Sequence, residues 1–168
     1  SRLYDGIVKD GLRQPVTALE YMNKFYLMEG NKRVSVMKYL DSVCIEAEVT
    51  RILPQRTEEL ENKIYFEFLP FYKDTEINYI WFTKPGSFER LYALTGKTPG
   101  TRWSSEERRD FEAAYMRFRT EYKAHNGDRL PITTGDAFLI YLEACGYADA
   151  PKKYSQQIRG EVRALWGE

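Results

Sequence analysis

Five consecutive residues, Glu29-Gly30-Asn31-Lys32-Arg33, combine the groups that a phosphate-binding turn needs. Gly30 permits a positive φ and lets a ligand approach the backbone closely. Lys32 supplies a mobile positive charge, and Arg33 supplies a planar fork that can grip two phosphate oxygens. Glu29 can orient Arg33, hold a metal ion or act as a base. The candidate catalytic residue is therefore Glu29, and the candidate ligand-binding residues are Gly30, Asn31, Lys32 and Arg33.

The sequence around this turn predicts a strand before it and a helix after it. Residues 25–28 form a compact apolar run, typical of a strand buried on both faces. The apolar side chains of residues 34–40 can share one helical face, and Asn31 is a candidate N-cap. Lys32 and Arg33 in the first turn oppose the helix macrodipole, at a cost of a few tenths to about 1 kcal/mol each. Anion binding explains this placement, and the alternative is that both cations lie in water.

The first third of the chain is predicted to be strand, strand, helix, strand. Pro15 cannot donate to a ladder, so a first strand over residues 16–19 begins after it and pairs with residues 25–28 as a hairpin. Residues 44–53 alternate apolar and polar side chains, which is typical of a half-buried strand, and Pro54 ends it.

After Pro54 the pattern becomes helical and rich in aromatic residues. Helices are predicted over residues 58–69, 87–94, 105–125, 133–145 and 155–166, with an extended piece over 77–82. Pro70 is expected to stop the first of these helices, Ser87 to cap the second, and Ser104 with Glu107 to form a capping box for the third. That third helix has an apolar stripe at helical spacing, which consists of Phe111, Ala114, Tyr115, Phe118 and Tyr122.

The expected fold class is therefore α+β, with a small mixed sheet and one helix followed by a mostly helical region. The predicted domains are residues 1–54 and 55–168, the second packed on the first. A chain of 168 residues with 43% hydrophobic residues has enough apolar surface for such a core. Its 25 basic and 25 acidic side chains balance, which excludes a globally basic DNA-coating protein.

Cysteine use and hydropathy indicate a reducing compartment. Cys44 and Cys145 are too far apart in the sequence for a zinc ribbon or a disulfide scaffold. No apolar run is long enough to span a bilayer, and the N-terminus lacks the pattern of a secretory signal. We therefore expect a cytoplasmic protein without a membrane partner. The abrupt ends at Ser1 and Glu168 indicate a piece of a longer chain.

The order of these motifs resembles the ParB/sulfiredoxin-like superfamily. Such domains have a Gly-x-x-Gln-Pro-Ile-like box, a strand, and a Gly-x-x-Arg motif that opens a helix. This chain has Gly11-Leu12-Arg13-Gln14-Pro15-Val16 for the box and Gly30-Asn31-Lys32-Arg33 for the motif. The resemblance covers about residues 5–54, a third of the chain. The strand and helix that usually precede the box are missing, so the first domain is expected to be truncated.

The resemblance implies a nucleotide or nucleic-acid phosphate held at the Gly-x-x-Arg turn. Members include CTP-dependent switches of chromosome partition, an ATP-dependent sulfinic-acid reductase, a serine kinase and defence proteins described as nucleases. By position, Gly30 supplies the turn, Lys32 and Arg33 contact phosphates, and Gln14 faces the same pocket. The implied cofactor is a nucleoside triphosphate, with Mg²⁺ where a reaction is catalysed.

This chain departs from the family at three points. Asn31 stands where the reductase has its catalytic cysteine, which argues against reductase chemistry. Partition proteins have Glu-Arg-Arg after the glycine, where this chain has Asn-Lys-Arg, and no basic helix-turn-helix follows. The histidine that related members carry at position 32 is replaced by lysine.

Other carboxylates and the single histidine have a less specific pattern. A nuclease needs a metal ion or an activated water, and Glu29 with Glu46 and Glu48 could supply ligands. Glu46 and Glu48 lie on the polar face of their predicted strand, however, where exposure to solvent is the simpler interpretation. His125, beside a helix stop at Asn126-Gly127, is interpreted as a helix cap and not as a catalyst.

The helical region offers further basic and aromatic groups. Arg108 and Glu112, at i,i+4, typify a solvated helix face on which charges pair with one another. Trp81 and Phe82 could stack on bases, but packing the helical region against the sheet is the preferred interpretation. A weaker basic cluster consists of Arg102, Lys152, Lys153, Arg159 and Arg163.

The preferred hypothesis is a ParB-like domain that acts as a nuclease or as a nucleotide-dependent, DNA-associated protein. Its partner is then a nucleotide or a nucleic acid. Two alternatives remain open. One is a non-catalytic module whose aromatic helical region binds a protein partner, and the other is a small-molecule phosphotransferase with Glu29 as its base.

Overall fold

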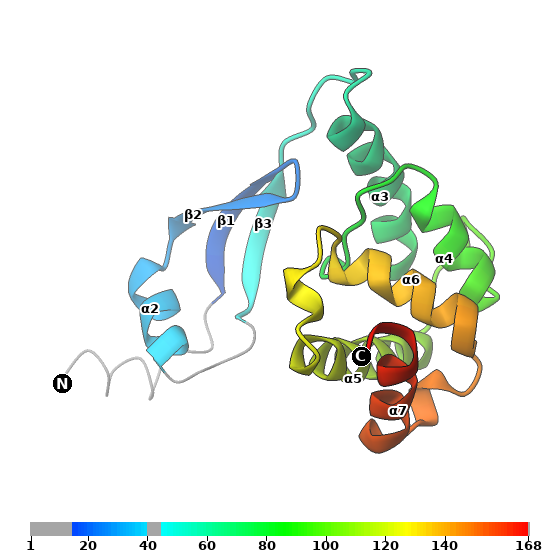
Figure 1. Cartoon of the computed structure of the whole chain (residues 1–168). Coiled ribbons are helices and arrows are strands. Elements are labelled where there is room, and N and C mark those ends of the chain that lie inside the picture. The colour runs from blue at the N-terminus through cyan, green and yellow to red at the C-terminus, as the bar shows by residue number, and fades with distance from the viewer. Residues whose placement is uncertain (1–14, 40–44, 168) are drawn as a thin grey trace. The chain divides into compact units, whose positions relative to one another are not determined.

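The chain divides into two compact units, Ser1–Gln55 and Arg56–Glu168, which we call the sheet unit and the helical unit. The computed structural model describes residues 15–39 and 45–167, without the side chains of residues 33, 36, 37 and 39. Figure 1 shows the strands in one unit and most of the helices in the other, which confirms the α+β class. Gln14, Leu40 and Cys44, used in the sequence predictions, lie outside the described residues.

The sheet unit is built on a three-stranded mixed sheet with the order β2-β1-β3. β1 (Val16–Tyr21) and β2 (Lys24–Glu29) form the predicted antiparallel hairpin. Its two-residue turn holds Met22 and Asn23 at positive φ, as a type I′ turn requires. α2 (Asn31–Tyr39) follows β2 and contacts β1, and β3 (Ala47–Arg51) then pairs in parallel with β1.

Two predictions about burial in this sheet are wrong. The apolar run of β2 was expected to be buried on both faces, yet Phe25, Tyr26 and Met28 are 50%, 53% and 60% exposed. The segment 44–53 was expected to be a half-buried strand, but its paired part is only β3, where Val49 is 40% exposed. Both strands are sheet edges with β1 as their one neighbour in the sheet, and an apolar pattern does not reveal an edge position.

The helical unit contains five α-helices and two short 3-10 helices in its described part. They are α3 (Leu60–Thr75), α4 (Ser87–Thr95), α5 (Ser105–Ala124), α6 (Thr134–Cys145) and α7 (Ser155–Trp166), with η2 (Gly127–Arg129) and η3 (Ala150–Lys152). The segment 77–82, predicted to be extended, is irregular and non-helical.

Capping boxes fix where α5 and α6 begin. The Ser104 hydroxyl accepts from the Glu107 N–H at 3.1 Å, and the Glu107 carboxylate accepts from the Ser104 N–H at 2.8 Å, which confirms the predicted box. Thr133 and Asp136 make the same reciprocal pair for α6. At α4 the prediction is off by one residue, because Gly86 at φ +81° occupies the cap position and Ser87 begins the helix.

Pro70 does not stop α3, contrary to the prediction. The helix passes through it and ends at Thr75, where Glu76 adopts the left-handed conformation and its N–H bonds to the Tyr72 carbonyl at 2.7 Å. Phe68 and Phe71, on either side of the proline, are each 1% exposed. Pro70 itself lies on the exposed side of α3. The favourable burial of the aromatic face offsets the loss of the one backbone hydrogen bond that proline cannot donate.

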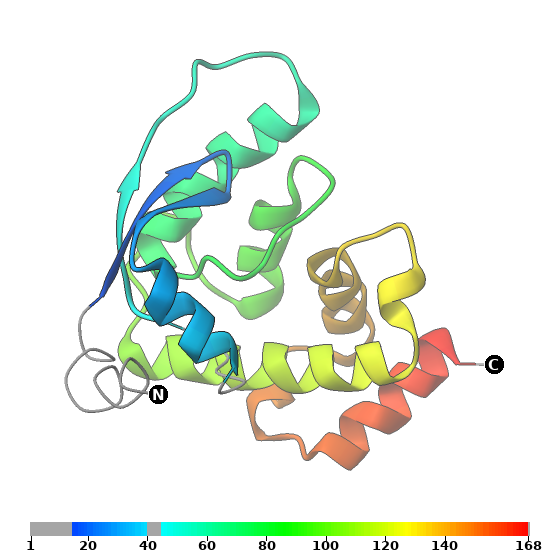
Figure 2. The same ribbon diagram turned by 90° about the vertical axis from the view of Figure 1, so that its left-hand side faces the viewer.

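Aromatic rings form most of the core of the helical unit. All five residues of the predicted α5 stripe are buried, and the Phe118 ring lies 4.9 Å from Tyr141 and 5.3 Å from Phe138 by centroid. α5 contacts both α6 and α7, as Figure 2 shows. Phe82 is fully buried with its centroid 4.8 Å from that of Phe88, so it packs within this core and is not available to stack on a base.

Candidate functional site

The predicted phosphate-binding turn lies where β2 ends and α2 begins. β2 ends at Glu29, and Gly30 follows at φ +100°, a conformation that glycine adopts without a steric cost. The Gly30 carbonyl accepts from the Val34 N–H at 3.0 Å, so Gly30 is the N-cap of α2. Asn31, predicted as the N-cap, is instead the first helical residue. The N–H groups of this first turn have no partner within the helix.

The charges at this turn are consistent with an anion site. The first turn of α2 contains no acidic residue, and the side chains of Asn31 and Lys32 are exposed. Within the described part of the chain, Lys32 forms no ion pair. Glu29 is also exposed, at the last position of β2, where it pairs with Thr17 in the ladder. The positive end of the helix therefore faces solvent with a lysine in its first turn.

The structure brings together some of the predicted site residues. Glu29, Gly30, Asn31 and Lys32 lie in one strand–turn–helix. The backbone of Arg33 belongs to the same first turn, but its side chain lies outside the described part. Gln14 also lies outside the described residues, so its predicted position in the pocket stays a prediction.

A metal site formed by Glu29, Glu46 and Glu48 is not present in the described structure. Residues 15–39 and 45–167 contain no group of three Asp, Glu, His or Cys side chains that could hold a metal ion. Glu29 and Glu48 pair with Thr17 from opposite sides, on β2 and on β3. Two strand spacings, about 9.5 Å, therefore separate their backbones, so the two glutamates are not neighbours in the sheet.

The predicted basic cluster of the helical unit is distributed over separate ion pairs. The pairs are Arg102–Glu76 at 2.6 Å, Lys153–Glu161 at 2.7 Å and Arg159–Glu121 at 2.8 Å. Arg108 also pairs with Glu76, whereas the sequence predicted Glu112 as its partner. The Arg159 hydrogen bond lowers the pKa of the buried Glu121 carboxyl. Arg102, Lys153 and Arg159 therefore serve internal pairing, whereas Lys152 and Arg163, the other two members of the predicted cluster, are exposed.

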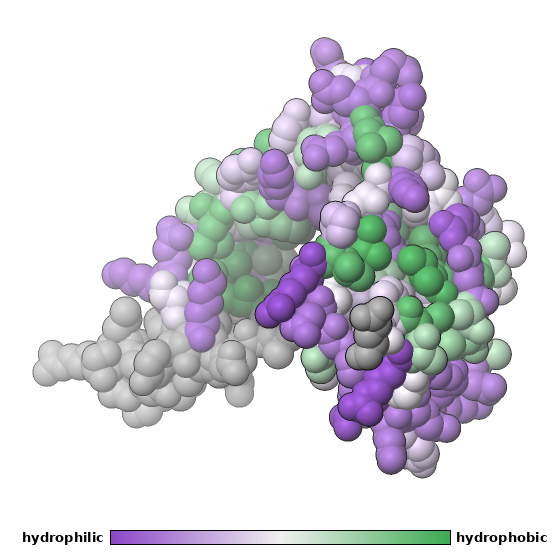
Figure 3. All heavy atoms as spheres, in the orientation of Figure 1, coloured by the Kyte–Doolittle hydropathy of each residue, from purple (hydrophilic) through white to green (hydrophobic). Residues whose placement is uncertain are grey.

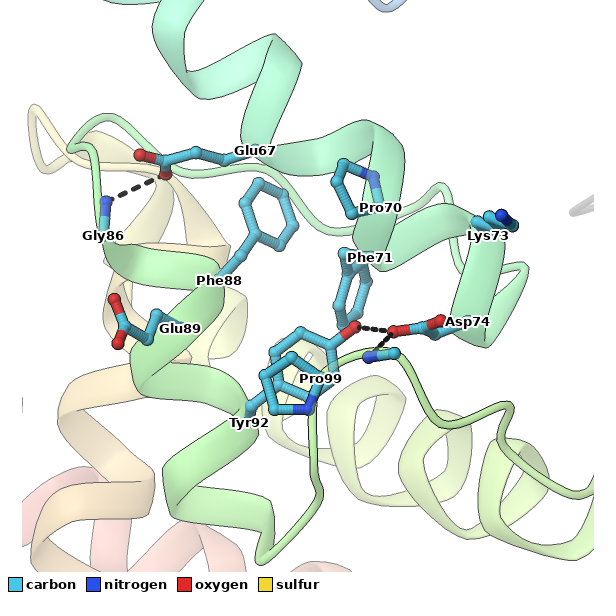
Figure 4. A pocket seen from close by; sticks show the side chains of 11 residues that line it. Glu67, Pro70, Phe71, Lys73, Asp74, Gly86, Phe88, Glu89, Tyr92 and Pro99 are labelled. Atoms are coloured by element: carbon cyan, nitrogen blue, oxygen red, sulfur yellow. Dashed lines mark hydrogen bonds between the residues drawn. The ribbon is translucent and has the colours of Figure 1, made fainter.

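A pocket between α3 and α4 was not predicted from the sequence. Its volume is about 530 Å³, and it includes part of the loop before α5 (Figure 4). The apolar lining residues are Pro70, Phe71, Phe88, Tyr92 and Pro99, and the charged ones are Glu67, Lys73, Asp74 and Glu89. These residues come from α3, α4 and the loop before α5. The sequence predicted that the first of these helices would stop at Pro70, which would have left Phe71 and Asp74 outside the helix.

Hydrogen bonds to two carboxylates fix the walls of this pocket. One oxygen of Asp74 accepts from the Tyr92 hydroxyl at 2.6 Å and from the Gly100 N–H at 2.7 Å. Glu67 accepts from the Gly86 N–H at 2.9 Å. Burial, and then the bond to Asp74, raises the pKa of the Tyr92 hydroxyl, so this hydroxyl stays a neutral donor at neutral pH. The loop and both helices are thus joined in one arrangement.

Of the helices in the described residues, none has the length and apolar character to cross a membrane. No known protein family, no curated protein sequence and no solved structure matches this chain.

Proposed function

We propose that the turn from Gly30 to Arg33 binds a phosphate group of a nucleotide or a nucleic acid. One observation carries this proposal: the N-terminus of α2 is exposed, is opened by a glycine at φ +100°, and has a lysine but no carboxylate in its first turn. Backbone N–H groups, the positive end of the helix dipole and a cation then belong to one helical turn, which is the combination that favours a phosphate.

Comparison with the other helices supports this interpretation. Four of the other α-helices, α3, α4, α5 and α6, each have an acidic residue in the first turn, where it interacts favourably with the dipole, whereas α7 has none. α2 has Lys32 and Arg33 instead, an arrangement that lowers helix stability in the absence of an anion. A bound phosphate offsets that cost, because its negative charge interacts favourably with the helix dipole and with the cations.

The resemblance to the ParB/sulfiredoxin-like superfamily supports the same proposal. The Gly-x-x-Arg motif falls at the strand–helix junction where that family holds phosphates, and Lys32 and Arg33 take the corresponding positions. Two activities are consistent with such binding. One is a nuclease with Glu29 as a candidate base and Mg²⁺ as cofactor, and the other is a nucleotide-dependent switch that associates with DNA.

A specific observation favours the alternative of a protein-interaction module. Phe25, Tyr26 and Met28 expose half or more of their surface on β2, and hydrophobic atoms gather over the strands in Figure 3. In the helical unit, which the sequence favoured for this role, the exposed large apolar side chains come from several different elements. They are Leu60, Leu130, Ile140, Tyr154 and Leu165.

The proposal is tested by titrating CTP, ATP and a short DNA duplex, with and without Mg²⁺, against variants of the full chain. The double variant Lys32→Ala, Arg33→Ala removes both first-turn cations, and the matched control Lys38→Ala removes an exposed lysine from the last turn of the same helix. We expect the double variant to bind at least one ligand about tenfold more weakly than wild type. The control is expected to change affinity less than about twofold, because its charge lies at the opposite end of α2.

Stability measurements separate a binding defect from a folding defect. Removing cations from a helix N-terminus relieves an unfavourable dipole interaction, so the double variant should unfold at the same or higher urea concentration than wild type. If no ligand distinguishes the double variant from wild type, phosphate binding at this turn is refuted and the interaction module becomes the better hypothesis. A labelled duplex that is shortened by wild type and not by Glu29→Gln would identify the nuclease activity.

A further inference from the structure

The pocket between α3 and α4 joins an apolar floor to an acidic rim, and it belongs to a different unit from the phosphate turn. Its volume of about 530 Å³ lies within the range of small-molecule sites. The Phe71 and Phe88 rings, at 1% and 3% exposure, form the floor with their centroids 5.0 Å apart. Pro70 and Pro99 are exposed at its mouth. An apolar group of a ligand would therefore lie against aromatic rings and prolines.

The charge of the rim is mainly negative. Three carboxylates, those of Glu67, Asp74 and Glu89, line the pocket, against the single ammonium of Lys73. Figure 4 shows Glu67 and Glu89 on the same side of the Phe88 ring, whereas Lys73 extends away from that ring. The lining consequently favours a cation and disfavours an anion.

The three carboxylates are not equivalent. Asp74 is buried and holds two donors, the Tyr92 hydroxyl and the Gly100 N–H, so its role is to fix the wall. Glu67 uses one oxygen for the Gly86 N–H, and Glu89 is exposed. In the described part of the chain, neither Glu67 nor Glu89 forms an ion pair. These two groups are left with a charge that no cation of this unit neutralises.

From these observations we infer that the pocket binds a small organic cation, in which an ammonium or guanidinium group is joined to a flat apolar body. The cationic group lies between Glu67 and Glu89, and the body lies on Phe71 and Phe88 beneath Pro70 and Pro99. Aromatic rings add a favourable interaction with the cation when it lies over a ring face. Bare metal ions fit less well, because the described residues contain no cluster of metal-ligating side chains.

The walls are held in place before a ligand arrives, which favours binding of a small molecule. Asp74 joins α3 to α4 through Tyr92 and to the loop through Gly100, and the Trp103 N–H donates to the Asp74 carbonyl at 2.9 Å. Glu67 joins α3 to the start of α4. A ligand therefore has little of the protein to order on binding, and a larger share of the contact energy appears as affinity.

The test is an NMR titration of the full chain with phenethylammonium, using the amide signals of Gly86 and Gly100 as local reporters. Phenylacetate, with the same ring and the opposite charge, is the matched ligand control. The variant Glu67→Gln, Glu89→Gln neutralises the rim and keeps an amide oxygen to accept from Gly86. Glu61→Gln, on the exposed part of α3 outside the pocket, is the control variant.

We expect phenethylammonium to shift both amides and to bind the neutralised variant about tenfold more weakly, because charge-assisted hydrogen bonds are replaced by neutral ones. Glu61→Gln should change the affinity less than about twofold. Equal binding of phenylacetate, or equal binding by the neutralised variant, would overturn the assignment. Tighter binding of an arginine-containing tripeptide than of the free amine would overturn the small-molecule assignment in favour of a peptide. Nucleotide binding at Gly30 is measured separately, so either proposal can fail alone.

Discussion

The two units of this chain use apolar side chains in opposite ways. In the helical unit, large rings such as Phe111, Phe118 and Phe138 are fully buried. In the described part of the sheet unit, the buried residues are Val16, Ala18 and Glu20. The large apolar side chains that are at least 40% exposed there include Phe25, Tyr26 and Met28 on β2 and Val49, Ile52 and Leu53 on or just after β3. Burial of apolar surface is the main favourable term in folding, so most of the stability of the chain should reside in the helical unit.

This difference bears on where each unit can bind a ligand. The described residues of the sheet unit bury few side chains, and a ligand that binds only the folded form of such a unit adds to its free energy of unfolding. The candidate phosphate turn lies in that unit. The proposed cation pocket lies instead between helices that are already joined by hydrogen bonds, and a ligand there also stabilises the fold according to its concentration relative to its Kd.

One substitution in each unit tests this difference in stability with the largest expected effect. Phe118→Ala removes a fully buried ring that contacts Tyr141 and Phe138, and we expect it to lower the free energy of unfolding by about 3–5 kcal/mol. Phe25→Ala removes a ring that is 50% exposed on an edge strand, and we expect a loss of about 1 kcal/mol or less. Urea denaturation followed by far-UV circular dichroism measures both. Equal losses would contradict the uneven distribution of stability.

Local signals in the sequence predict much of the helical unit. The α5 capping box and stripe were predicted correctly, because Ser104, Glu107 and the stripe residues act within a few turns of one helix. The predicted helix end at Pro70 was wrong, because a helix can continue through a proline when the side chains on either side of it are buried against other segments. Phe68 and Phe71 contact rings from other segments, and no local pattern reveals those contacts.

The candidate sites show the same division between local and non-local information. The strand–glycine–helix at Gly30 could be predicted because all of its residues are consecutive. The pocket could not, because Glu67, Glu89 and Pro99 meet only through the packing of α3, α4 and the loop before α5. The exposure of β2 was missed for a similar reason, since position at a sheet edge is set by strand order.

Glycine substitutions test how tightly the helical unit is packed. A Cβ at Gly135 would overlap the Trp81 carbonyl oxygen and press on Ile80 at 3.0 Å, so we expect Gly135→Ala to lower the free energy of unfolding by about 2 kcal/mol. Gly160, in the middle of α7, has no atom within 4 Å of such a Cβ. Gly160→Ala should raise stability by about 0.5–1 kcal/mol, because alanine is the better helix former. Thermal unfolding of the two variants shows whether their melting temperatures move in opposite directions, and a shift in the same direction would contradict tight packing at Gly135.

Alkaline pH tests the buried tyrosines of the helical unit. Burial, followed by the bond to Glu161 at 2.7 Å, raises the pKa of the Tyr141 hydroxyl, and burial raises the pKa of Tyr147 to about 12. The unfolded chain loses these protons near pH 10, whereas the folded chain retains them. The stabilising effect is therefore complete below about pH 10 and is lost as the pH rises further, at about 1.4 kcal/mol per pH unit for each such tyrosine.

In Tyr141→Phe this proton is absent from both states, so the decline in the free energy of unfolding above pH 10 should be less steep than in wild type by that amount. Urea denaturation at a series of pH values measures the two slopes. Tyr154→Phe is the matched control, because it removes the same hydroxyl from a side chain that is 79% exposed. Identical slopes for wild type and Tyr141→Phe would show that water reaches the Tyr141 hydroxyl. The difference in burial between the helical unit and the described part of the sheet unit would then be smaller than the buried rings of the helical unit indicate.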